Sequence, residues 1–539
     1  MSDVTRRRLL GGTAALGGVV TADLIPALPA AAAAPGKGAG LGPVRIGQQD
    51  PRYADLAVRG TNQRFRPKPE YFQVVGSTEQ VVKAVGDAVR AGKRVTVRSG
   101  GHCYENFVGD GSQVVIDMCE MNEVSFDERR GAFMVQPGAT LMDVYRTLHL
   151  GWGVTLPGGQ CGTVAAGGHI VGGGYGALSR RYGLTIDYLH AVEVVVVDKS
   201  GRARAVVATR DPRDPNHDLW WAHTGAGGGN FGIVTRYWLR DPKAKGNDPA
   251  KLLPRPPAEL LTGVAVWSWQ GMTKEAFRRL LSNHGAWHER NSDPSSPYAS
   301  LFGVLMVNGR SDGADPGGIV LACQMDATGA DAEKRMKDFI AAVGEGVTPA
   351  ATVLPIGRQP WYQAIRSFAL SEGEQSSHFK VKSGYLRKRF TDRQIDVAYD
   401  HLSTPASTTR ALWAVSYGGQ VNTVPSTATA TAERDSILKV FCLATWQDAK
   451  DDGTQLRWVR EFHRDLYATT GGVPVPGGNC GGAYINYPDT DHADPKWNTS
   501  GVPWTTLYFG GNYPRLQRVK AHWDPKNVFH HAMSIRLPA

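Results

Sequence analysis

Apolar residues follow two different patterns along the chain, one on each side of a proline-rich segment at residues 252–257. Before that segment, short runs of apolar residues predict buried strands. Between several of these runs, apolar residues at helical spacing predict helices. We expect strands at residues 94–98, 114–118, 192–197 and 232–238, and a helix that begins at Ser77 or Thr78 and buries Val81, Val82 and Val85. The first part of the chain, at about residues 71–242, is therefore predicted to be α/β or α+β.

The proline-rich segment is predicted to be a linker, because repeated prolines interrupt both helices and sheets. After it, separated strands alternate with longer amphipathic helices. The strands are expected at residues 301–307, 319–325, 411–417 and 438–444, and two of the helices at residues 277–284 and 332–343. This pattern predicts an antiparallel sheet with one face covered by helices. From Gly471 onward the chain is rich in Pro, Gly and Asn and is predicted to be loop and short helix.

Composition narrows the classes of function. The 539 residues are enough for two or three domains, and the net charge of +10 arises from 60 basic and 50 acidic residues. No Lys/Arg stripe is interleaved with aromatic residues, so we interpret the charge as a solvated basic surface and not as a nucleic-acid interface. None of the six cysteines pairs as C-x-x-C, which leaves zinc and thioredoxin-like sites without support, while disulfide partners stay open.

The N-terminus has the pattern of an export signal. Arg6, Arg7 and Arg8 precede a Gly/Ala/Leu/Val stretch, and small residues at 30–34 resemble an Ala-x-Ala cleavage site. The paired arginines indicate residues 1–34 as a twin-arginine signal peptide. Asp23 and the many glycines argue against a membrane anchor. We therefore expect a secreted protein that uses the twin-arginine export machinery and has no membrane contact after cleavage.

Glycine is concentrated in three loops, at residues 98–102, 157–176 and 225–232. The second loop has nine glycines in twenty residues, which would destabilise a helix or a strand. Successive backbone N–H groups without side chains can surround a flat, phosphate-bearing ligand closely. The G-x-G-x-x-G fingerprint of nicotinamide-binding folds does not fit these loops. The three loops together therefore predict a cofactor site of another kind.

These loops carry a family resemblance. RSGGHCYENF, PGGQCGTVAAGGHIVGGGYG, TGAGGGNFGIVT and, near the C-terminus, AYINYPD resemble the berberine-bridge-enzyme-like branch of the vanillyl-alcohol-oxidase flavoproteins. The resemblance extends over essentially the whole mature chain. Within the branch it points most to bacterial antibiotic-tailoring oxidases such as glycopeptide hexose oxidase, aclacinomycin oxidoreductase and tirandamycin oxidase. It implies an α+β fold with a two-lobed PCMH-type FAD-binding domain and a substrate domain built on an antiparallel sheet backed by helices.

The resemblance also implies domain boundaries and a cofactor site. It places the FAD-binding domain at residues 68–242, the substrate domain at 258–470 and a segment that returns to the FAD domain at 471–539. It implies FAD bound covalently at two points, through His102 and Cys161. Either residue alone would more often be a polar loop histidine or a small buried cysteine. The cofactor-binding candidates are Arg98, Ser99, Gly100, Gly101, His102, Cys161, Gly162, Thr163, Gly167, Gly168, His169, Gly172, Gly173, Gly227, Gly228, Asn230, Phe231, Gly232, Asn486 and Tyr487. No metal ligands are predicted.

Three tyrosines are the catalytic candidates. Tyr487 stands where sugar-oxidising members of the family have the tyrosine that takes the alcohol proton, and a base role requires a lowered pKa. Tyr175 is a candidate hydrogen-bond partner, and Tyr417 a second acid or base for which packing is an equal alternative. Trp267, Trp269, Trp361 and Tyr362 are candidates for a wall that stacks on substrate, although four core aromatics would look the same in sequence.

The resulting expectation is an FAD-dependent oxidase that removes hydride from an alcohol of a sugar or other natural product and passes electrons to O₂, giving H₂O₂. The partners are then a small-molecule alcohol or glycoside and O₂. Three alternatives stay open: an oxidase of oligosaccharides or polyketide alcohols, a dehydrogenase with another electron acceptor, and a secreted flavin-free binding protein. The sequence does not decide the substrate, the oxidation level of the product or the oligomeric state.

Overall fold

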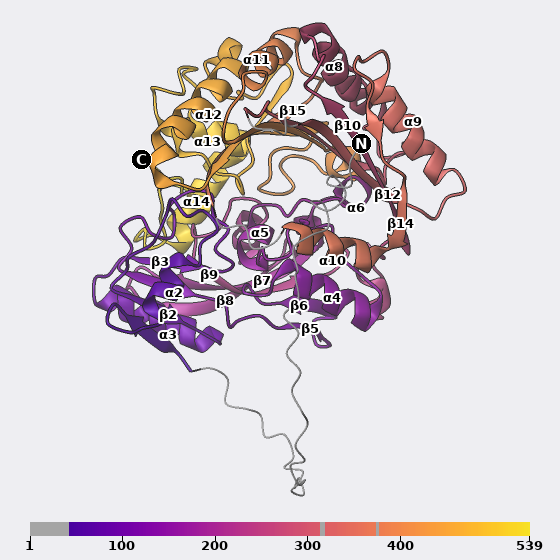
Figure 1. The fold of residues 1–539 in the computed structure, drawn as a ribbon. Helices are drawn as coiled ribbons and strands as arrows, with labels where there is room; N and C mark the ends of the chain where they lie inside the picture. Colours follow the sequence, from indigo (N-terminus) through magenta and orange to yellow (C-terminus); the bar gives the residue numbers. More distant parts are fainter. Residues whose placement is uncertain (1–41, 313–317, 373–376) are drawn as a thin grey trace, which may run out of the picture. The chain divides into compact units, whose positions relative to one another are not determined.

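Two β-sheets form between residues 44 and 239, and a third, larger sheet is built mainly from the chain after residue 258. The computed structural model describes residues 42–312, 318–372 and 377–539 (Figure 1). The predicted signal peptide at residues 1–34 lies outside the described residues. The three sheets and the helices between them confirm the α+β class predicted from the sequence.

The first sheet is mixed, in the order β1-β2-β4-β3. Its strands are β1 (Val44–Gly47), β2 (Tyr71–Val74), β3 (Val95–Arg98) and β4 (Val114–Asp117). β2 and β3 both pair with β4 in parallel, so the chain must cross over between β2 and β3, which it does through α3 (Thr78–Arg90). The Ser77 side chain accepts a hydrogen bond from the Gln80 backbone and caps α3, as the sequence predicted.

The second sheet is antiparallel, in the order β5-β6-β9-β7-β8. Its strands are β5 (Val124–Asp127), β6 (Ala132–Val135), β7 (Leu189–Val197), β8 (Ala203–Thr209) and β9 (Ile233–Leu239). The helices of this part are α2 (Tyr53–Val58), α4 (Leu141–Trp152), α5 (Ala166–Val171), α6 (Ser179–Tyr182) and α7 (His217–Ala222). The predicted strands at 192–197 and 232–238 are confirmed. The second glycine-rich segment, predicted as a loop at residues 157–176, contains the short helix α5.

The third sheet has nine strands, and every pairing within it is antiparallel. The strand order is β13-β10-β12-β11-β16-β17-β15-β18, with β14 also paired to β10. The strands are β10 (Glu259–Ser268), β11 (Phe302–Asn308), β12 (Gly318–Asp326), β13 (Thr352–Val353), β14 (Gly357–Pro360), β15 (His378–Leu386), β16 (Thr409–Ser416), β17 (Leu438–Trp446) and β18 (Cys480–Gly482). The four strands predicted in this region are confirmed, and residues 252–257 between the second and third sheets contain no strand or helix.

Helices cover one face of the third sheet. α8 (Lys274–Asn291), α9 (Ala332–Gly344), α11 (Asp392–Leu402) and α12 (Asp452–Leu466) pack together along that face (Figure 1). Because side chains alternate along a strand, Leu305 and Val307 of β11 join the helix-side core, while Val304 and Met306 point to the other face. The predicted arrangement, a sheet with one face covered by helices, is confirmed. α10 (Trp361–Glu372) is not part of this layer and contacts α4, β14 and β10.

The C-terminal segment, from residue 471 onward, connects the third sheet with the third glycine-rich loop. It contributes β18 to the third sheet and continues through α13 (Trp504–Phe509) and α14 (Tyr513–Trp523). The buried Lys520 ammonium of α14 donates to Asp524, at 2.6 Å, and to the backbone carbonyls of Asn230 and Phe529. Asn230 belongs to the third glycine-rich loop, so this segment also holds that loop in place. The predicted domain boundaries stay predictions, because residues 41–539 form a single cluster of contacts.

Three further observations concern only the described part of the chain. None of its helices combines the length and the apolar character that crossing a membrane requires. Its six cysteines form no disulfide with one another. No group of three or more His, Cys, Asp or Glu side chains in these ranges is arranged to hold a metal ion.

Candidate active site

A cavity of about 950 Å³ lies between the three glycine-rich loops and the face of the third sheet opposite α8, α9, α11 and α12. Val304, Trp413, Phe441 and Leu443 form part of its apolar wall. Most of the site residues predicted from the sequence line this cavity. They are Arg98, Ser99, Gly100, Gly101, His102, Cys161, Gly167, Gly168, His169, Tyr175, Gly227, Gly228, Asn230, Gly232, Asn486 and Tyr487. Loops far apart in sequence therefore contribute to one site.

The first glycine-rich loop is held by buried ion pairs. The Arg98 guanidinium binds the Asp117 carboxylate at 2.6 Å, with both side chains almost completely buried. Arg59 also pairs with Asp117, and it donates to the Ser99 backbone carbonyl at 2.6 Å. At Gly100 a Cβ would lie 2.7 Å from the Ala165 backbone nitrogen, so only glycine allows the first and second loops to approach this closely. The ion pair of Arg98 with Asp117 therefore stabilises the conformation of the loop.

His102 and Cys161 come together at one hydroxyl group. The Thr163 Oγ1 lies 3.1 Å from His102 Nε2 and 3.6 Å from Cys161 Sγ. Burial, and then the nearby positive charge of Arg59, lower the pKa of His102 to about 4. The imidazole is therefore neutral at physiological pH and keeps a free lone pair for bond formation. Two potential attachment residues thus face the cavity side by side.

The cavity fits a flat, phosphate-bearing group such as FAD. A Cβ at Gly168 would meet no protein atom within 4 Å, although this residue lines the cavity, and a Cβ at Gly228 would meet only Val171, at 3.6 Å. Side chains at these positions would project into cavity space that a bound ligand needs. Glycine at both positions therefore leaves room for a planar group against the backbone, with His102 and Cys161 beside it.

Six candidates lie outside the cavity lining: Gly162, Thr163, Gly172, Gly173, Phe231 and Tyr417. The structure gives several of them supporting contacts. Thr163 lies between His102 and Cys161 and contacts both. A Cβ at Gly172 would collide with the amide of Asn486, so this glycine admits Asn486 to the site. Phe231 is buried and packs edge-on against His223 at 5.6 Å.

Tyr487 stands at the cavity in an aromatic cluster. Its ring stacks on Tyr104, with centroids 4.9 Å apart and planes 8° apart, and meets Phe441 edge-on at 4.8 Å. Burial raises the pKa of Tyr487 well above its ordinary value, which is opposite to the lowering that a base role requires. The Asn486 side chain beside it donates to the His169 backbone carbonyl at 3.0 Å, which links the C-terminal motif to the second loop.

Tyr175 and Tyr417 occupy different positions relative to the cavity. Tyr175 lines the cavity, and its hydroxyl donates to the Ser416 backbone carbonyl. Tyr417 packs behind Tyr175, with ring centroids 5.1 Å apart, and its buried hydroxyl donates to the Glu433 backbone carbonyl at 3.2 Å. The structure therefore favours the packing alternative for Tyr417, because it has no surface on the cavity.

Sequence reasoning missed Lys439, the second residue of β17. Its Nζ lies 3.9 Å from the ring centre of Tyr175, 4.2 Å from that of Tyr484 and 5.1 Å from that of Tyr487. Burial lowers the pKa of Lys439 well below its ordinary value. No carboxylate lies within ion-pair distance of it among the described residues. The signal in the sequence is a lysine at an inward-facing position of the otherwise apolar strand LKVFCLATW.

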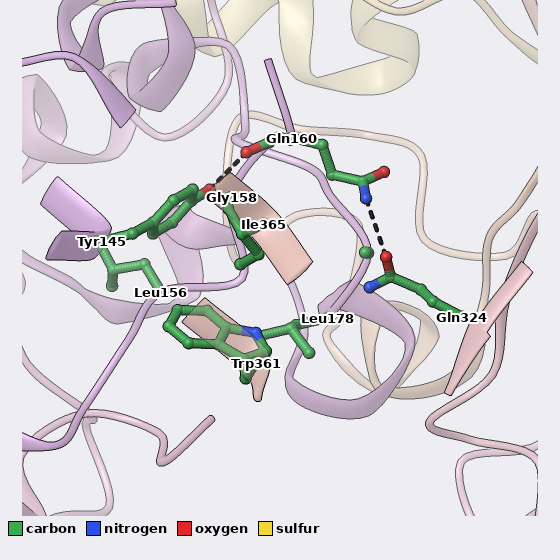
Figure 2. A pocket seen from close by; sticks show the side chains of 10 residues that line it. Tyr145, Leu156, Gly158, Gln160, Leu178, Gln324, Trp361 and Ile365 are labelled. Atoms are coloured by element: carbon green, nitrogen blue, oxygen red, sulfur yellow. Dashed lines mark hydrogen bonds between the residues drawn. The ribbon is translucent and has the colours of Figure 1, made fainter. Parts of the chain in front are cut away.

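The proposed tryptophan wall is corrected by the structure. Trp267 and Trp269 lie in the helix-side core of the third sheet. Trp361 lines a separate pocket of about 20 Å³, together with Tyr145 (Figure 2). At the edge of this pocket the Gln160 side chain donates to the Gln324 side chain at 3.0 Å, connecting the Cys161 loop to β12 (Figure 2). The aromatic side chains of the third sheet that line the cavity include Trp413 and Phe441 instead, because strand register places them on that side.

Replacing Lys439 by Met should change how stability depends on pH. In the wild type the folded-state pKa of Lys439 lies below the ordinary 10.5, so the unfolded chain binds more protons than the folded protein between those two values. Wild-type stability therefore falls as pH is lowered through that range. The variant lacks this loss. The unfolding free energy of the variant minus that of the wild type should therefore increase by up to about 1.4 kcal/mol for each unit by which the pH falls.

Chemical unfolding at a series of pH values below 10.5 measures this difference. Lys274→Met is the matched control, because Lys274 is partly exposed and paired with Asp400 at the surface. Parallel pH dependences for Lys439→Met and the wild type would show that Lys439 is charged in the folded protein.

Comparison with known proteins agrees with this site. The FAD binding domain family matches residues 69–204, and the family described as berberine and berberine like matches residues 483–536. Aclacinomycin-N/aclacinomycin-A oxidase of Streptomyces galilaeus is 51% identical, with 100% of this chain and 99% of that protein covered. Hexose oxidase of Chondrus crispus is 32% identical, with 90% and 93% covered.

A solved structure extends the likeness to three dimensions. The crystal structure of a glycopeptide hexose oxidase complexed with teicoplanin matches with a TM-score of 0.88 and 52% identity, covering 92% of this chain and 99% of that one. The matched family segments contain His102, Cys161 and Tyr487, which the structure brings to one cavity. The chain therefore belongs to the berberine-bridge-enzyme-like family of FAD-binding oxidases.

Proposed function

We propose that the protein oxidises an alcohol group on a sugar or other natural product in antibiotic tailoring, with FAD as cofactor and O₂ as electron acceptor. The observation that carries this proposal is the shared cavity, in which the His102 and Cys161 pair and the Tyr487, Tyr175 and Lys439 cluster face the same space. The names of the relatives support the substrate class, since they are oxidases of aclacinomycins and of hexoses.

The cofactor would be held covalently at two points. His102 is neutral because its pKa is low, and Cys161 lies on the other side of the Thr163 hydroxyl. The glycine-rich loops would contact the remainder of FAD through their backbones. Two bonds to one ring system would hold it against the loops without deep burial on its other side, which leaves the sheet side of the cavity to the substrate. Bound FAD supplies the hydride acceptor and returns electrons to O₂ with release of H₂O₂.

The aromatic cluster would accept the proton of the substrate hydroxyl and pass a proton on to Lys439. Before substrate binds, burial favours the neutral forms of Tyr487 and Lys439, since it raises the pKa of the tyrosine and lowers that of the lysine. Tyr487 accepts the hydroxyl proton, and its own proton moves toward Lys439, whose ammonium form is then stabilised by the surrounding ring faces. The Tyr175 ring also contacts the Lys439 Nζ, and the Tyr175 hydroxyl donates to the Ser416 backbone carbonyl.

The wall of the cavity indicates a substrate with a large apolar part. Val304, Met306, Trp413, Phe441 and Leu443 present an apolar surface that a free monosaccharide would not cover. A glycoside of an apolar aglycone fits this surface better, because its sugar can reach Tyr487 while the aglycone contacts the sheet. An oligosaccharide or a polyketide alcohol remains the alternative substrate.

Tyr487→Phe should slow substrate-dependent reduction of the flavin by about 10²- to 10⁴-fold, because it removes the group that accepts the hydroxyl proton. Anaerobic stopped-flow absorbance, with a panel of glycosylated antibiotics, free hexoses and oligosaccharides, measures this rate. Tyr362→Phe is the control, since Tyr362 lies on α10 outside the cavity lining. Equal rates for Tyr487→Phe and the wild type would contradict the base role. Reduction without peroxide in air would favour the dehydrogenase alternative.

His102→Ala and Cys161→Ala should each retain FAD through the remaining bond, and the double variant should carry none covalently. Intact mass of the denatured protein, followed by peptide mapping, distinguishes these states without any assay of activity. Cys442→Ala is the control, because that cysteine is buried in the helix-side core of the third sheet and does not line the cavity. A wild-type protein that carries no flavin after expression with FAD available would contradict the proposal and favour a flavin-free binding protein.

We further propose that residues 1–34 direct export through the twin-arginine pathway, which carries folded proteins and so suits a chain that acquires its cofactor first. The proposal depends on the sequence pattern at Arg6 and Arg7. We expect secreted protein with an N-terminus near Pro35, and cytoplasmic retention of an Arg6→Lys, Arg7→Lys variant. Unchanged export of that variant, checked by N-terminal sequencing of the culture fluid, would argue for another route.

A further inference from the structure

A cluster of buried charges lies outside the cavity, on the other face of β15. We call it the buried ion cluster and define it as Glu105, Lys380, Lys382, Asp489 and Asp491. Lys380 and Lys382 alternate with Phe379 and Val381, which line the cavity, so the two lysines point away from it. The mechanism proposed above uses none of these five side chains.

The geometry of the cluster centres on Lys380. Its Nζ binds the Asp489 carboxylate at 2.8 Å and also pairs with Glu105. Among the described residues, Lys380 is the only cation within ion-pair distance of Glu105. Lys382 pairs with Asp489 and, at 3.0 Å, with Asp491. Carboxylates and ammonium groups buried this deeply are stable only when they are paired.

Other charged and titratable groups face the cluster from the elements around it. Arg460 of α12 binds Asp491 at 2.8 Å, and Arg64 donates to the Phe379 backbone carbonyl nearby. His463 and His492 stay neutral, because burial lowers the pKa of both. Tyr508 accepts a hydrogen bond from the Asp489 backbone. Asp489 and Asp491 keep their charge, since the two lysines hold the pKa of each below its ordinary value despite burial.

The cluster joins the two chain segments that form the aromatic stack at the cavity. Glu105 directly follows Tyr104, and Asp489 is two residues after Tyr487. These two tyrosines stack with their planes 8° apart. The Lys380 ammonium therefore ties together the segments immediately behind both rings. Glu105 also lies three residues after His102, so the same contact fixes the end of the proposed attachment loop.

We propose that Lys380 is a positioning residue, which sets Tyr487 and the His102 loop in register by holding Glu105 and Asp489 on one ammonium group. The inference rests on the proposed function, because it assigns a purpose to the placement of Tyr487. Without the ammonium, the Glu105 carboxylate is left buried, unpaired and close to two other carboxylates. Their repulsion moves the Tyr104 segment away from Tyr487, unless Glu105 takes up a proton.

This behaviour differs from a simple loss of stability in its pH dependence. An unpaired buried carboxylate has a raised pKa. Below that raised value Glu105 is neutral and the repulsion is absent, and above it the repulsion returns. A Lys380→Met variant should therefore be most active relative to wild type at low pH and lose activity as pH rises. Adding Glu105→Gln removes the charge and should remove this pH dependence.

The experiment measures anaerobic flavin reduction against pH in the holoprotein, with a substrate that the wild type oxidises. Lys380→Met should be slower than wild type by about tenfold or more at mildly alkaline pH, as expected for a displacement of order 1 Å at the reacting groups. The double variant with Glu105→Gln should recover part of this rate at alkaline pH and show a flat pH profile, but it should stay slower than wild type because the contact between Lys380 and Glu105 is still absent. Peptide mapping should show less flavin on His102 in Lys380→Met, while linkage at Cys161 is retained.

Two controls separate positioning from destabilisation. Lys274→Met removes an exposed lysine paired with Asp400, and Leu280→Ala opens a cavity in the helix-side core away from the active site. Leu280→Ala should lower the melting temperature without altering the pH profile or the flavin linkage. A Lys380→Met protein that behaves like Leu280→Ala, with no pH-dependent loss and no rescue by Glu105→Gln, would overturn the inference.

A second variant keeps the test decisive if Lys380→Met does not fold. Glu105→Ala leaves Lys380 paired with Asp489 and releases only the His102 loop, so we expect lower linkage at His102 and slower flavin reduction. Wild-type values for both would overturn the inference. A wild type that carries flavin but reduces it with no alcohol tested contradicts the proposed function instead, and the linkage measurement still decides the role of Lys380.

Discussion

Side chains of the nine-stranded sheet point alternately to a helix layer and to a cavity. This alternation determines which residues of the sheet can take part in the active site. The helix side is a packed apolar core that includes Leu305 and Val440. On the cavity side, apolar side chains such as Val304 and Phe441 line the cavity and are not packed beneath the helix layer. A shift of register by one residue would exchange the two sets, so the strand pairing must be held firmly. The wide antiparallel pairing, with β18 added by the C-terminal segment, provides that constraint.

The same alternation separates two kinds of buried lysine. Lys439 faces the cavity among aromatic rings, with no carboxylate at ion-pair distance in the described part of the chain, so burial favours its neutral form. Lys380 faces the other way and is paired with Glu105 and Asp489, so it stays charged. A neutral amine can take up a proton during a reaction, whereas a paired ammonium mainly holds its partners in place. The difference between a chemical and a structural lysine therefore arises from the neighbours and not from the residue type.

Close backbone approach is the second requirement of the site. Gly100 permits contact with Ala165, and Gly168 leaves space toward the cavity where a side chain would otherwise project. This approach brings His102 and Cys161, which are far apart in sequence, to the same Thr163 hydroxyl. The C-terminal segment then completes the site with Asn486 and Tyr487, and the Lys520 contacts hold the third loop against it.

From its local patterns, the sequence alone predicted the fold class, the strands and helices with the clearest periodicity, and the residues of the three glycine-rich loops, because periodicity and glycine concentration are local properties of the chain. It also indicated His102, Cys161 and Tyr487 through motifs with distinctive spacing. The tertiary structure was needed to identify the aromatics that line the cavity: it placed Trp267 and Trp269 in the core and Tyr417 behind Tyr175. It also revealed Lys439 and the buried ion cluster. The burial and the partners of a charged residue depend on strand register and on segments distant in sequence, and these long-range contacts leave no local pattern in the chain.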